Sequence, residues 1–266
     1  MRDFRFSEFG ERTRAPLMLI HGGMLDRRSW ARQQELADQF RLITPDLPGH
    51  GLNRQAQKTF CVDSAAHELV ELLDYARAEG AYVLGFSLGG MVAQRMAEIA
   101  SDRLAGVILY ACPLIAHFRG MFARDLVAFM ATLDSRLRSW SSIKNKWATL
   151  CTKDVAGQFD VLRAMSLLEV GDYQNMFKAL VHAVRWDPEY RIPISSAYFW
   201  GTEDVRMANV PKLAGVYRSL YGDSCMTEFP GAGHCVHWEM PALFNSAVIH
   251  QLAAWQSAPA RKNLFL

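Results

Sequence analysis

The sequence lacks a long apolar segment. No stretch approaches the roughly 20 consecutive apolar residues that a membrane-spanning helix needs. The first ten residues, MRDFRFSEFG, hold no apolar run of the length found in signal peptides. We therefore expect no membrane partner and a cytoplasmic location.

The chain also has little net charge. Its 29 Lys and Arg side chains almost balance its 27 Asp and Glu side chains, which leaves +2 at pH 7. Proteins that bind nucleic acid usually carry a marked excess of positive charge. This balance argues against a nucleic-acid partner.

Cysteines are few and scattered. Their number is odd and no pair has C-x-x-C spacing, so neither a disulfide framework nor a zinc site is indicated. This usage favours a reducing compartment. The five residues are Cys61, Cys112, Cys151, Cys225 and Cys235.

What the chain does contain is an alternation of strand and helix patterns. This alternation predicts an α/β fold with a mostly parallel sheet and helices on both faces. A helix over 62–80 is expected to be capped by Asp63 or Ser64 and to end at Gly80. Strands are predicted at 17–21, 41–45, 81–86, 104–111, 194–200 and 224–229, and further helices at 88–100 and 240–256.

The pattern changes over 113–191, where the sequence looks helical throughout. A connection of this length far exceeds an ordinary crossover between strands. We predict a core domain formed by 1–112 and 192–266 and a helical cap inserted at 113–191. The alternative is a run of connecting helices packed on the sheet.

The stretch GFSLGG (85–90) matches G-x-S-x-G at the predicted junction of a strand and a helix. In such a turn the serine backbone is strained and its hydroxyl is exposed, while the flanking glycines let strand and helix approach closely. Ser87 is therefore a candidate nucleophile. The alternative is a glycine-rich turn that binds phosphate or only packs.

A serine hydroxyl needs a base, and the base needs an orienting acid. Both should follow the serine in the order acid, then histidine. His234 lies in the loop PGAGH (230–234) after the last predicted strand, and His237 beside it suits a structural or capping role. FWGTED (199–204) supplies Asp204 as the acid, with Glu203 as the alternative.

An oxyanion hole is the fourth expected element. HGGM (21–24) follows the first buried strand, and glycines there let a backbone N–H approach a substrate. The N–H of Leu88, directly after the serine, should supply the second donor. A plain turn is the alternative interpretation of HGGM.

Taken together, these residues resemble the α/β-hydrolase superfamily in its capped, esterase-like branch. The resemblance implies Ser87 as nucleophile, Asp204 as acid, His234 as base, and an oxyanion N–H from Gly23. It also implies a sheet of about seven or eight strands, although 3–9 offers only one strand before Pro16. The matching pieces are HGGM (21–24), PDLPGHG (45–51), GFSLGG (85–90), GTED (201–204) and GAGH (231–234).

The expected function is hydrolysis of a carboxylic ester, or a related acyl bond, of a small and largely apolar substrate. A serine in place of the aspartate of dehalogenases and epoxide hydrolases indicates acyl transfer, with neither cofactor nor metal. A lactonase, a thioesterase, a carbon–carbon bond hydrolase and a ligand receptor without turnover remain alternatives. Large apolar residues of the insertion form cap core or line the pocket: Phe118, Met121, Phe122, Phe129, Met130, Trp140, Trp147, Phe159, Met165, Met176, Phe177 and Trp186.

One basic stretch stands out in the insertion. RLRSWSSIKNK (136–146) holds four cationic side chains and no acid. It is either a solvated face or a docking surface for an acidic partner, such as an acyl carrier protein.

Overall fold

A computed structural model describes residues 4–54, 60–117, 132–207 and 209–257. Within these ranges the centre is a seven-stranded sheet of order β1-β3-β2-β4-β5-β6-β7, in which β1 alone is antiparallel to its neighbour. The mostly parallel sheet predicted from sequence is confirmed. The strands are β1 (Phe6–Phe9), β2 (Pro16–Ile20), β3 (Arg41–Pro45), β4 (Ala81–Phe86), β5 (Leu104–Tyr110), β6 (Ser196–Gly201) and β7 (Met226–Phe229).

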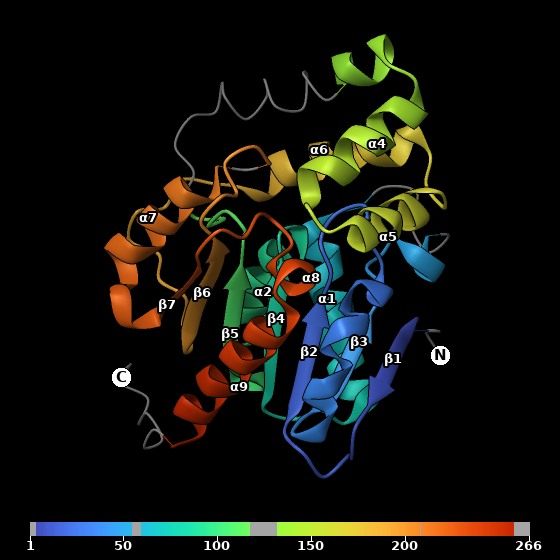
Figure 1. The fold of residues 1–266 in the computed structure, drawn as a ribbon. Helices are drawn as coiled ribbons and strands as arrows, with labels where there is room; N and C mark the ends of the chain where they lie inside the picture. Colours follow the sequence, from blue (N-terminus) through green and yellow to red (C-terminus); the bar gives the residue numbers. More distant parts are fainter. Residues whose placement is uncertain (1–3, 55–59, 118–131, 208, 258–266) are drawn as a thin grey trace.

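Helices cover both faces of this sheet (Figure 1). The 3-10 helix η1 packs with α9 on one face, and α1 packs with α2 on the other, while α7 flanks β6. Covered on both sides, the central strands are buried along almost their whole length, which is why they read as continuous apolar runs. The bounds are η1 (Arg27–Asp38), α1 (Val62–Ala76), α2 (Leu88–Ile99), α7 (Val210–Tyr221), α8 (Val236–Glu239) and α9 (Pro241–Ser257).

The connection from β5 to β6 carries the helical insertion. Its helices α4 (Trp140–Cys151), α5 (Val155–Met165) and α6 (Val170–Ala183) lie beyond the arrowheads of the parallel strands in Figure 1. The two ends of the insertion are tied together, because Arg185 N–H donates to the carbonyl of Ile115 at 2.7 Å. A helical insertion is thus confirmed, and we call its described residues 132–184, which include α4–α6, the cap.

The sequence predicted the start of α1 at residue 62 correctly but misplaced its N-cap and its C-terminal end. The helix begins after Cys61, so Asp63 and Ser64 lie inside its first turn, and no side chain caps it. It ends at Ala76 instead of Gly80, because Arg77 adopts a left-handed conformation with φ 51°. That turn is closed by a 2.8 Å hydrogen bond between the N–H of Ala78 and the carbonyl of Leu73, a bond typical of helix ends.

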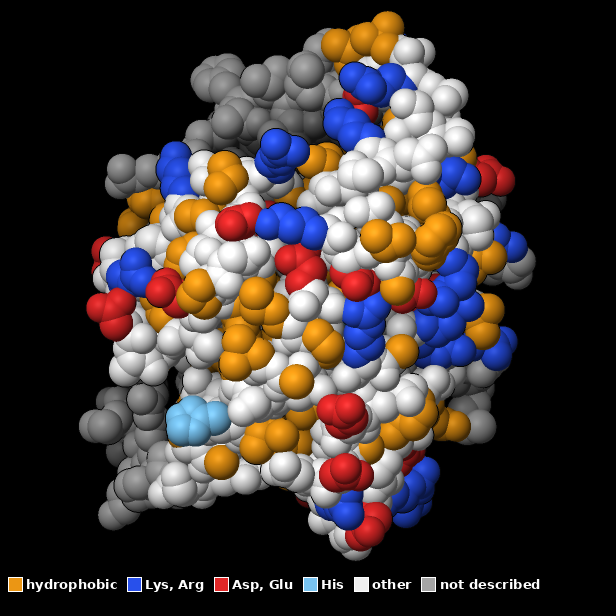
Figure 2. All heavy atoms as spheres, viewed as in Figure 1, with side chains coloured by type: hydrophobic (Ala, Val, Ile, Leu, Met, Phe, Trp, Pro, Cys, Tyr) orange, Lys and Arg blue, Asp and Glu red, His pale blue; other side chains and the backbone are white. Residues whose placement is uncertain are grey.

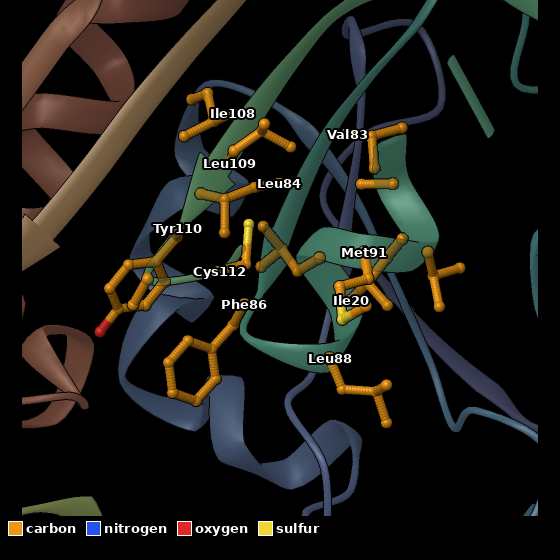
Figure 3. Packing of buried hydrophobic residues seen from close by; sticks show 14 of the residues in the cluster. Ile20, Val83, Leu84, Phe86, Leu88, Met91, Ile108, Leu109, Tyr110 and Cys112 are labelled. Carbon is orange, nitrogen blue, oxygen red and sulfur yellow. The ribbon is translucent and has the colours of Figure 1, made fainter. Parts of the chain in front are cut away.

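The core between β4, β5 and α2 fixes the point where the two strands end (Figure 3). The Phe86 and Tyr110 rings, at the last positions of β4 and β5, stack with centroids 4.6 Å apart. Met91 of α2 is buried in the same cluster. This packing orients the turn that follows Phe86.

Some features are absent from the described part of the chain. No described helix has the length and apolarity to cross a membrane. Among the same residues, no three His, Cys, Asp or Glu side chains gather to hold a metal ion. The five cysteines are free thiols.

Candidate active site

Ser87 occupies a strained turn between β4 and α2. Its φ of 51° and ψ of −113° fall in a region that residues other than glycine rarely populate. The Ser87 N–H donates to the carbonyl of Tyr110 at 2.8 Å, and its own carbonyl accepts from Gly90 N–H at 3.0 Å. A Cβ on Gly85 would lie 2.3 Å from the carbonyl oxygen of Gly89, so the crossing of strand and helix requires glycine.

His234 and Asp204 meet at the end of the neighbouring strands. His234 follows β7 and Asp204 follows β6, and only 3% and 2% of their surfaces are exposed. The imidazole Nδ1 is hydrogen-bonded to the Asp204 carboxylate. Glu203 is exposed and forms an ion pair with Lys153, so the structure brings Asp204, and not Glu203, to the histidine.

One cavity connects these residues with the predicted oxyanion donors. It has a volume of about 380 Å³, and Ser87, Leu88, Gly23 and His234 all line it. Leu88 is the first residue of α2, where backbone N–H groups lack partners within the helix. Four of the five predicted site residues therefore border one space, and Asp204 lies behind His234.

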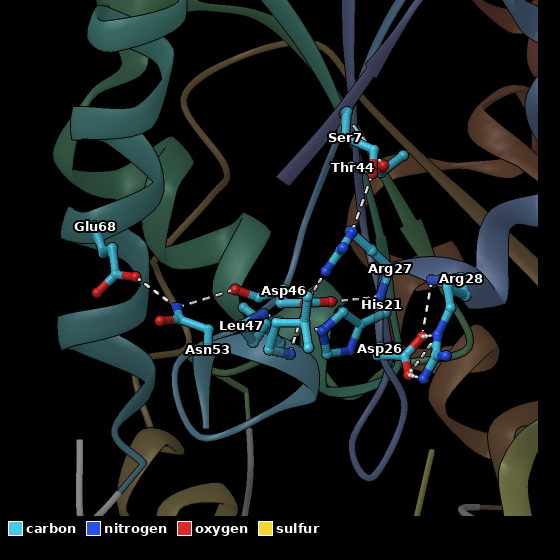
Figure 4. A network of polar contacts seen from close by, with 11 residues as sticks. Ser7, His21, Asp26, Arg27, Arg28, Thr44, Asp46, Leu47, Asn53 and Glu68 are labelled. Atoms are coloured by element: carbon cyan, nitrogen blue, oxygen red, sulfur yellow. Dashed lines mark hydrogen bonds and ion pairs between the residues drawn. The ribbon is translucent and has the colours of Figure 1, made fainter. Parts of the chain in front are cut away.

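The loop that carries Gly23 is fastened by His21 (Figure 4). The Nδ1 of His21 contacts the carbonyl of Gly22 at 2.8 Å, and Nε2 accepts from Leu47 N–H at 3.0 Å. Nδ1 therefore carries the proton. Burial lowers the pKa of His21, which keeps it in this neutral form. The loop after β2 is thus tied to the loop after β3.

Asp46 organises the PDLPGHG loop from its interior (Figure 4). Its carboxylate accepts from the N–H groups of Arg27 at 2.8 Å and Leu52 at 2.9 Å, and it forms an ion pair with Arg27. His50 is buried in the same loop, with Nδ1 3.0 Å from the carbonyl of Pro48. The loop supports the site from outside the cavity.

Sequence reasoning missed the role of Tyr110. Its hydroxyl donates to the carbonyl of His234 at 2.9 Å and lies 3.1 Å from Nδ1 of His237. His237 is fully buried, and its pKa is lowered well below the usual value, first by burial and then by the neighbouring His234. The sequence signal was a tyrosine at the last position of a central strand.

The cap supplies much of the cavity wall. Met176 lies directly over the loop that carries Gly23, since a Cβ on Gly23 would be 2.3 Å from its sulfur. Trp140 packs within the cap against Tyr173, and Phe159 is exposed. Phe118, Met121, Phe122, Phe129 and Met130 lie outside the described residues. The cap residues that line the cavity are Trp147, Leu150, Cys151, Met176, Phe177, Leu180, Val181 and Val184.

The stretch 136–146 carries less unpaired positive charge than its sequence suggests. Asp134, just before it, forms ion pairs with both Arg138 and Lys146, and Lys144 lies over the Trp140 ring. Arg136 is exposed. Figure 2 likewise shows acidic and basic side chains intermixed on the face that it draws.

Several curated proteins are similar to parts of this chain. It is 32% identical over 159 residues to pimeloyl-[acyl-carrier protein] methyl ester esterase of Nitrosomonas europaea, covering 57% of this chain and 58% of that one. It is 34% identical over 129 residues to the dihydrolipoyllysine-residue acetyltransferase component of the acetoin cleaving system of Pseudomonas putida, covering 48% and 35%. Esterase YbfF of Escherichia coli is 24% identical over 242 residues, covering 85% and 89%. The chain thus spans only about a third to three fifths of the first two relatives.

Solved structures share the fold over nearly the whole chain. MenH from S. aureus superposes with a TM-score of 0.80 at 18% identity, covering 97% of this chain and 100% of that one. An esterase from Thermogutta terrifontis gives 0.76 at 23% identity, covering 95% and 93%. The model of the alpha/beta hydrolase family matches residues 17–247, which is most of the sequence. The chain belongs to the alpha/beta hydrolase family.

Proposed function

We propose that this protein is a serine hydrolase that cleaves a carboxylic ester of a small, largely apolar substrate through an acyl-enzyme. The observation that carries the proposal is one cavity lined by both Ser87, on its strained turn, and His234, whose imidazole is hydrogen-bonded to the buried Asp204 behind it. A nucleophile, a base and an orienter of the base are the three parts of a Ser-His-Asp triad.

In the first half of the reaction His234 removes the proton of Ser87 as the hydroxyl attacks the ester carbonyl. Since Nδ1 of His234 is hydrogen-bonded to Asp204, Nε2 is the nitrogen left to act as base. The N–H groups of Gly23 and Leu88 stabilise the oxyanion, and Asp204 stabilises the imidazolium.

In the second half His234 returns its proton to the departing alcohol, which leaves an ester on Ser87. Water then attacks that ester with His234 again as the base, the bond between the acyl group and Ser87 Oγ breaks, the carboxylic acid leaves, and His234 returns the proton to Ser87. The clamp of Tyr110 on the His234 backbone keeps the ring in one position through both halves.

The cavity supports an apolar substrate. Most of its wall consists of aliphatic, aromatic and methionine side chains, and the methionines adapt readily to the shape of a ligand. Relatives named as esterases agree with this choice of bond.

Labelling with a fluorophosphonate, followed by peptide mass spectrometry, tests the nucleophile directly. One adduct on Ser87 is expected in the wild type, with none in Ser87→Ala, which should also lose turnover of 4-nitrophenyl esters. Ser219→Ala is the control, because Ser219 is an exposed serine of α7. An adduct elsewhere, or full turnover by Ser87→Ala, would refute the proposal. Comparing kcat/KM for lactones, thioesters and diketones with that for esters shows which bond the enzyme cleaves best.

An ester carried by an acyl carrier protein is a second candidate. The Nitrosomonas relative is named for such a substrate, and Arg136 is an exposed cation on the cap. Hydrolysis of a carrier-bound ester should then fall between 50 and 500 mM salt and in Arg136→Gln, while small esters are unaffected. Equal behaviour of the two substrates would exclude this candidate.

A further inference from the structure

Arg206 is out of place in the wall of the active-site cavity. Among the described residues that line the cavity, it is the one side chain that is charged at every physiological pH. Its neighbours in the wall are apolar, including Met207 and Leu213 from the same stretch of chain. A cavity built only for an apolar substrate has no need of a guanidinium at its edge.

The acids near Arg206 in the sequence are engaged elsewhere. Asp204 is hydrogen-bonded to His234, and Glu203 is paired with Lys153 of the cap. Within the described part of the chain, no acidic side chain forms an ion pair with Arg206. Its side chain is exposed, so the guanidinium is free to bind a ligand that reaches the cavity mouth.

The backbone of Arg206 is held by the same turn that presents Asp204. The N–H of Asp204 donates to the carbonyl of Gly201 at 3.2 Å, and the N–H of Val210 donates to the carbonyl of Asp204 at 2.9 Å. Asn209 N–H closes the turn on the carbonyl of Val205 at 3.2 Å. These hydrogen bonds flank Arg206 on both sides and tie the turn to Asp204.

We propose that Arg206 is a specificity residue that binds a carboxylate on the substrate, separated from the scissile ester by an apolar segment. The planar guanidinium can donate two parallel hydrogen bonds to a carboxylate, which an ammonium cannot match. The substrate class is then an ester with one acidic end, such as a half-ester of a dicarboxylic acid. This inference rests on the proposed function, because it names the substrate of the same site.

Matched ester pairs test the proposal by kinetics. Mono-4-nitrophenyl adipate against 4-nitrophenyl hexanoate places the acid on the acyl side. The pair 4-hexanoyloxybenzoate and 4-hexanoyloxybenzamide places it on the alcohol side. The wild type should prefer the acid of at least one pair by about tenfold in kcat/KM, the effect of one good charge-assisted contact. The preference should shrink in 0.5 M salt, since the pair is exposed.

Three variants assign that preference. Arg206→Gln should lose it, and Arg206→Lys should keep only part of it, because the charge stays but the fork is lost. Lys212→Gln is the matched control, since it removes the same charge from an exposed position of α7 that does not line the cavity. In Lys212→Gln the ratio of kcat/KM for the acidic and neutral esters should equal that of the wild type. No preference in the wild type, or one that persists in Arg206→Gln, would overturn the assignment.

A binding measurement separates this inference from the proposed function. Calorimetry with Ser87→Ala, which cannot form the acyl-enzyme, should show tighter binding of monomethyl adipate than of methyl hexanoate. The difference should vanish in Ser87→Ala/Arg206→Gln. If neutral esters are turned over at Ser87 but both ligands bind alike, Arg206 has no such role and the proposed function stands. If the acid binds tighter but no ester is turned over, the proposed function fails and the subsite stands.

Discussion

The turn around Ser87 and the cap above it are held by different kinds of force. The turn is fixed by steric contact between backbones: a Cβ on Gly89 would lie 2.4 Å from the carbonyl oxygen of Ile20. The cap is attached to the core partly through ion pairs that water reaches, such as Arg32–Asp154 and Lys153–Glu203. Close-packed backbone resists displacement, whereas exposed ion pairs contribute little to stability.

This difference in rigidity places the proposed reacting residues and much of the cavity wall in separate regions of the molecule. The residues proposed to react are presented by the core, where small shifts are costly. Much of the cavity wall comes from α4 and α6 of the cap. We expect substitutions in the core region to act on rate or folding as a whole, and substitutions in the cap to act on substrate choice.

The largest effect should come from Asp204, the acid of the proposed triad. Asp204→Asn should lower kcat by about 10⁴-fold, because the amide no longer holds the imidazole in the tautomer that leaves Nε2 free. Glu203→Gln, the matched control one residue away, should change kcat less than about twofold. Steady-state kinetics with 4-nitrophenyl esters measures both, and equal losses would contradict the assignment of Asp204.

The next effect tests the rigidity of the turn. Gly85→Ala should lower the free energy of unfolding by about 3 kcal/mol or more, since the new Cβ would lie 2.3 Å from the Gly89 carbonyl oxygen. Gly215→Ala on α7 has open space around its Cβ and should instead stabilise by about 0.5–1 kcal/mol. Urea denaturation compares the two, and a mild effect at Gly85 would show that the turn can relax.

Acid should loosen the core loops through buried histidines. Burial, and then the nearby His21, lowers the pKa of His50 to about 3, and burial also lowers the pKa of His21 and His237. Below about pH 6.5 the unfolded chain takes up protons that the folded chain refuses. Stability is therefore full above this pH. Through His50 it should fall toward pH 3 by up to about 1.4 kcal/mol per pH unit, and His21 and His237 contribute to the fall in the same direction.

His50→Gln isolates one of these contributions. The slope of unfolding free energy between pH 6 and 4 should become shallower by about 1.4 kcal/mol per unit in this variant. His250→Gln, at an exposed position of α9, should keep the wild-type slope. Urea denaturation at several pH values across this range measures the slopes. Equal slopes for His50→Gln and the wild type would disprove the contribution of His50.

The smallest effect should come from the attachment of the cap. A double-mutant cycle of Arg32→Gln and Asp154→Asn should give a coupling energy of about 0.2–1 kcal/mol, as for other partly exposed ion pairs. Urea denaturation of the four proteins yields this number. A coupling several times larger would mean that the cap is held as firmly as the turn, and would break the contrast between the two regions.

The loops that form the candidate site could be predicted from the sequence, because each of them follows the end of a strand. Apolar runs ending in HGG, GFSLGG, GTED and GAGH placed four loops at one edge of a parallel sheet, and the structure brings them to one cavity or directly behind it. Local rules did less well on the N-cap and the C-terminal end of α1. The helix begins at Val62 without a side-chain cap, and Arg77 takes a conformation more usual for glycine.

Contacts between distant segments were beyond the reach of the sequence. Nothing local shows that the Tyr110 hydroxyl meets the carbonyl of His234, 124 residues away. The basic stretch of the cap appeared unpaired because Asp134 lies just outside it. Nothing in the sequence singles out Arg206, because its proposed role depends on the apolar cavity wall that surrounds it.

The strained conformation of Ser87 has a consequence for how such a site can diversify. The backbone at this position is imposed by Gly85, Gly89 and the carbonyl of Tyr110, none of which depends on the serine side chain. The turn therefore keeps its backbone conformation whichever side chain residue 87 carries. Replacing Ser87 by cysteine or aspartate should leave the fold of the turn intact.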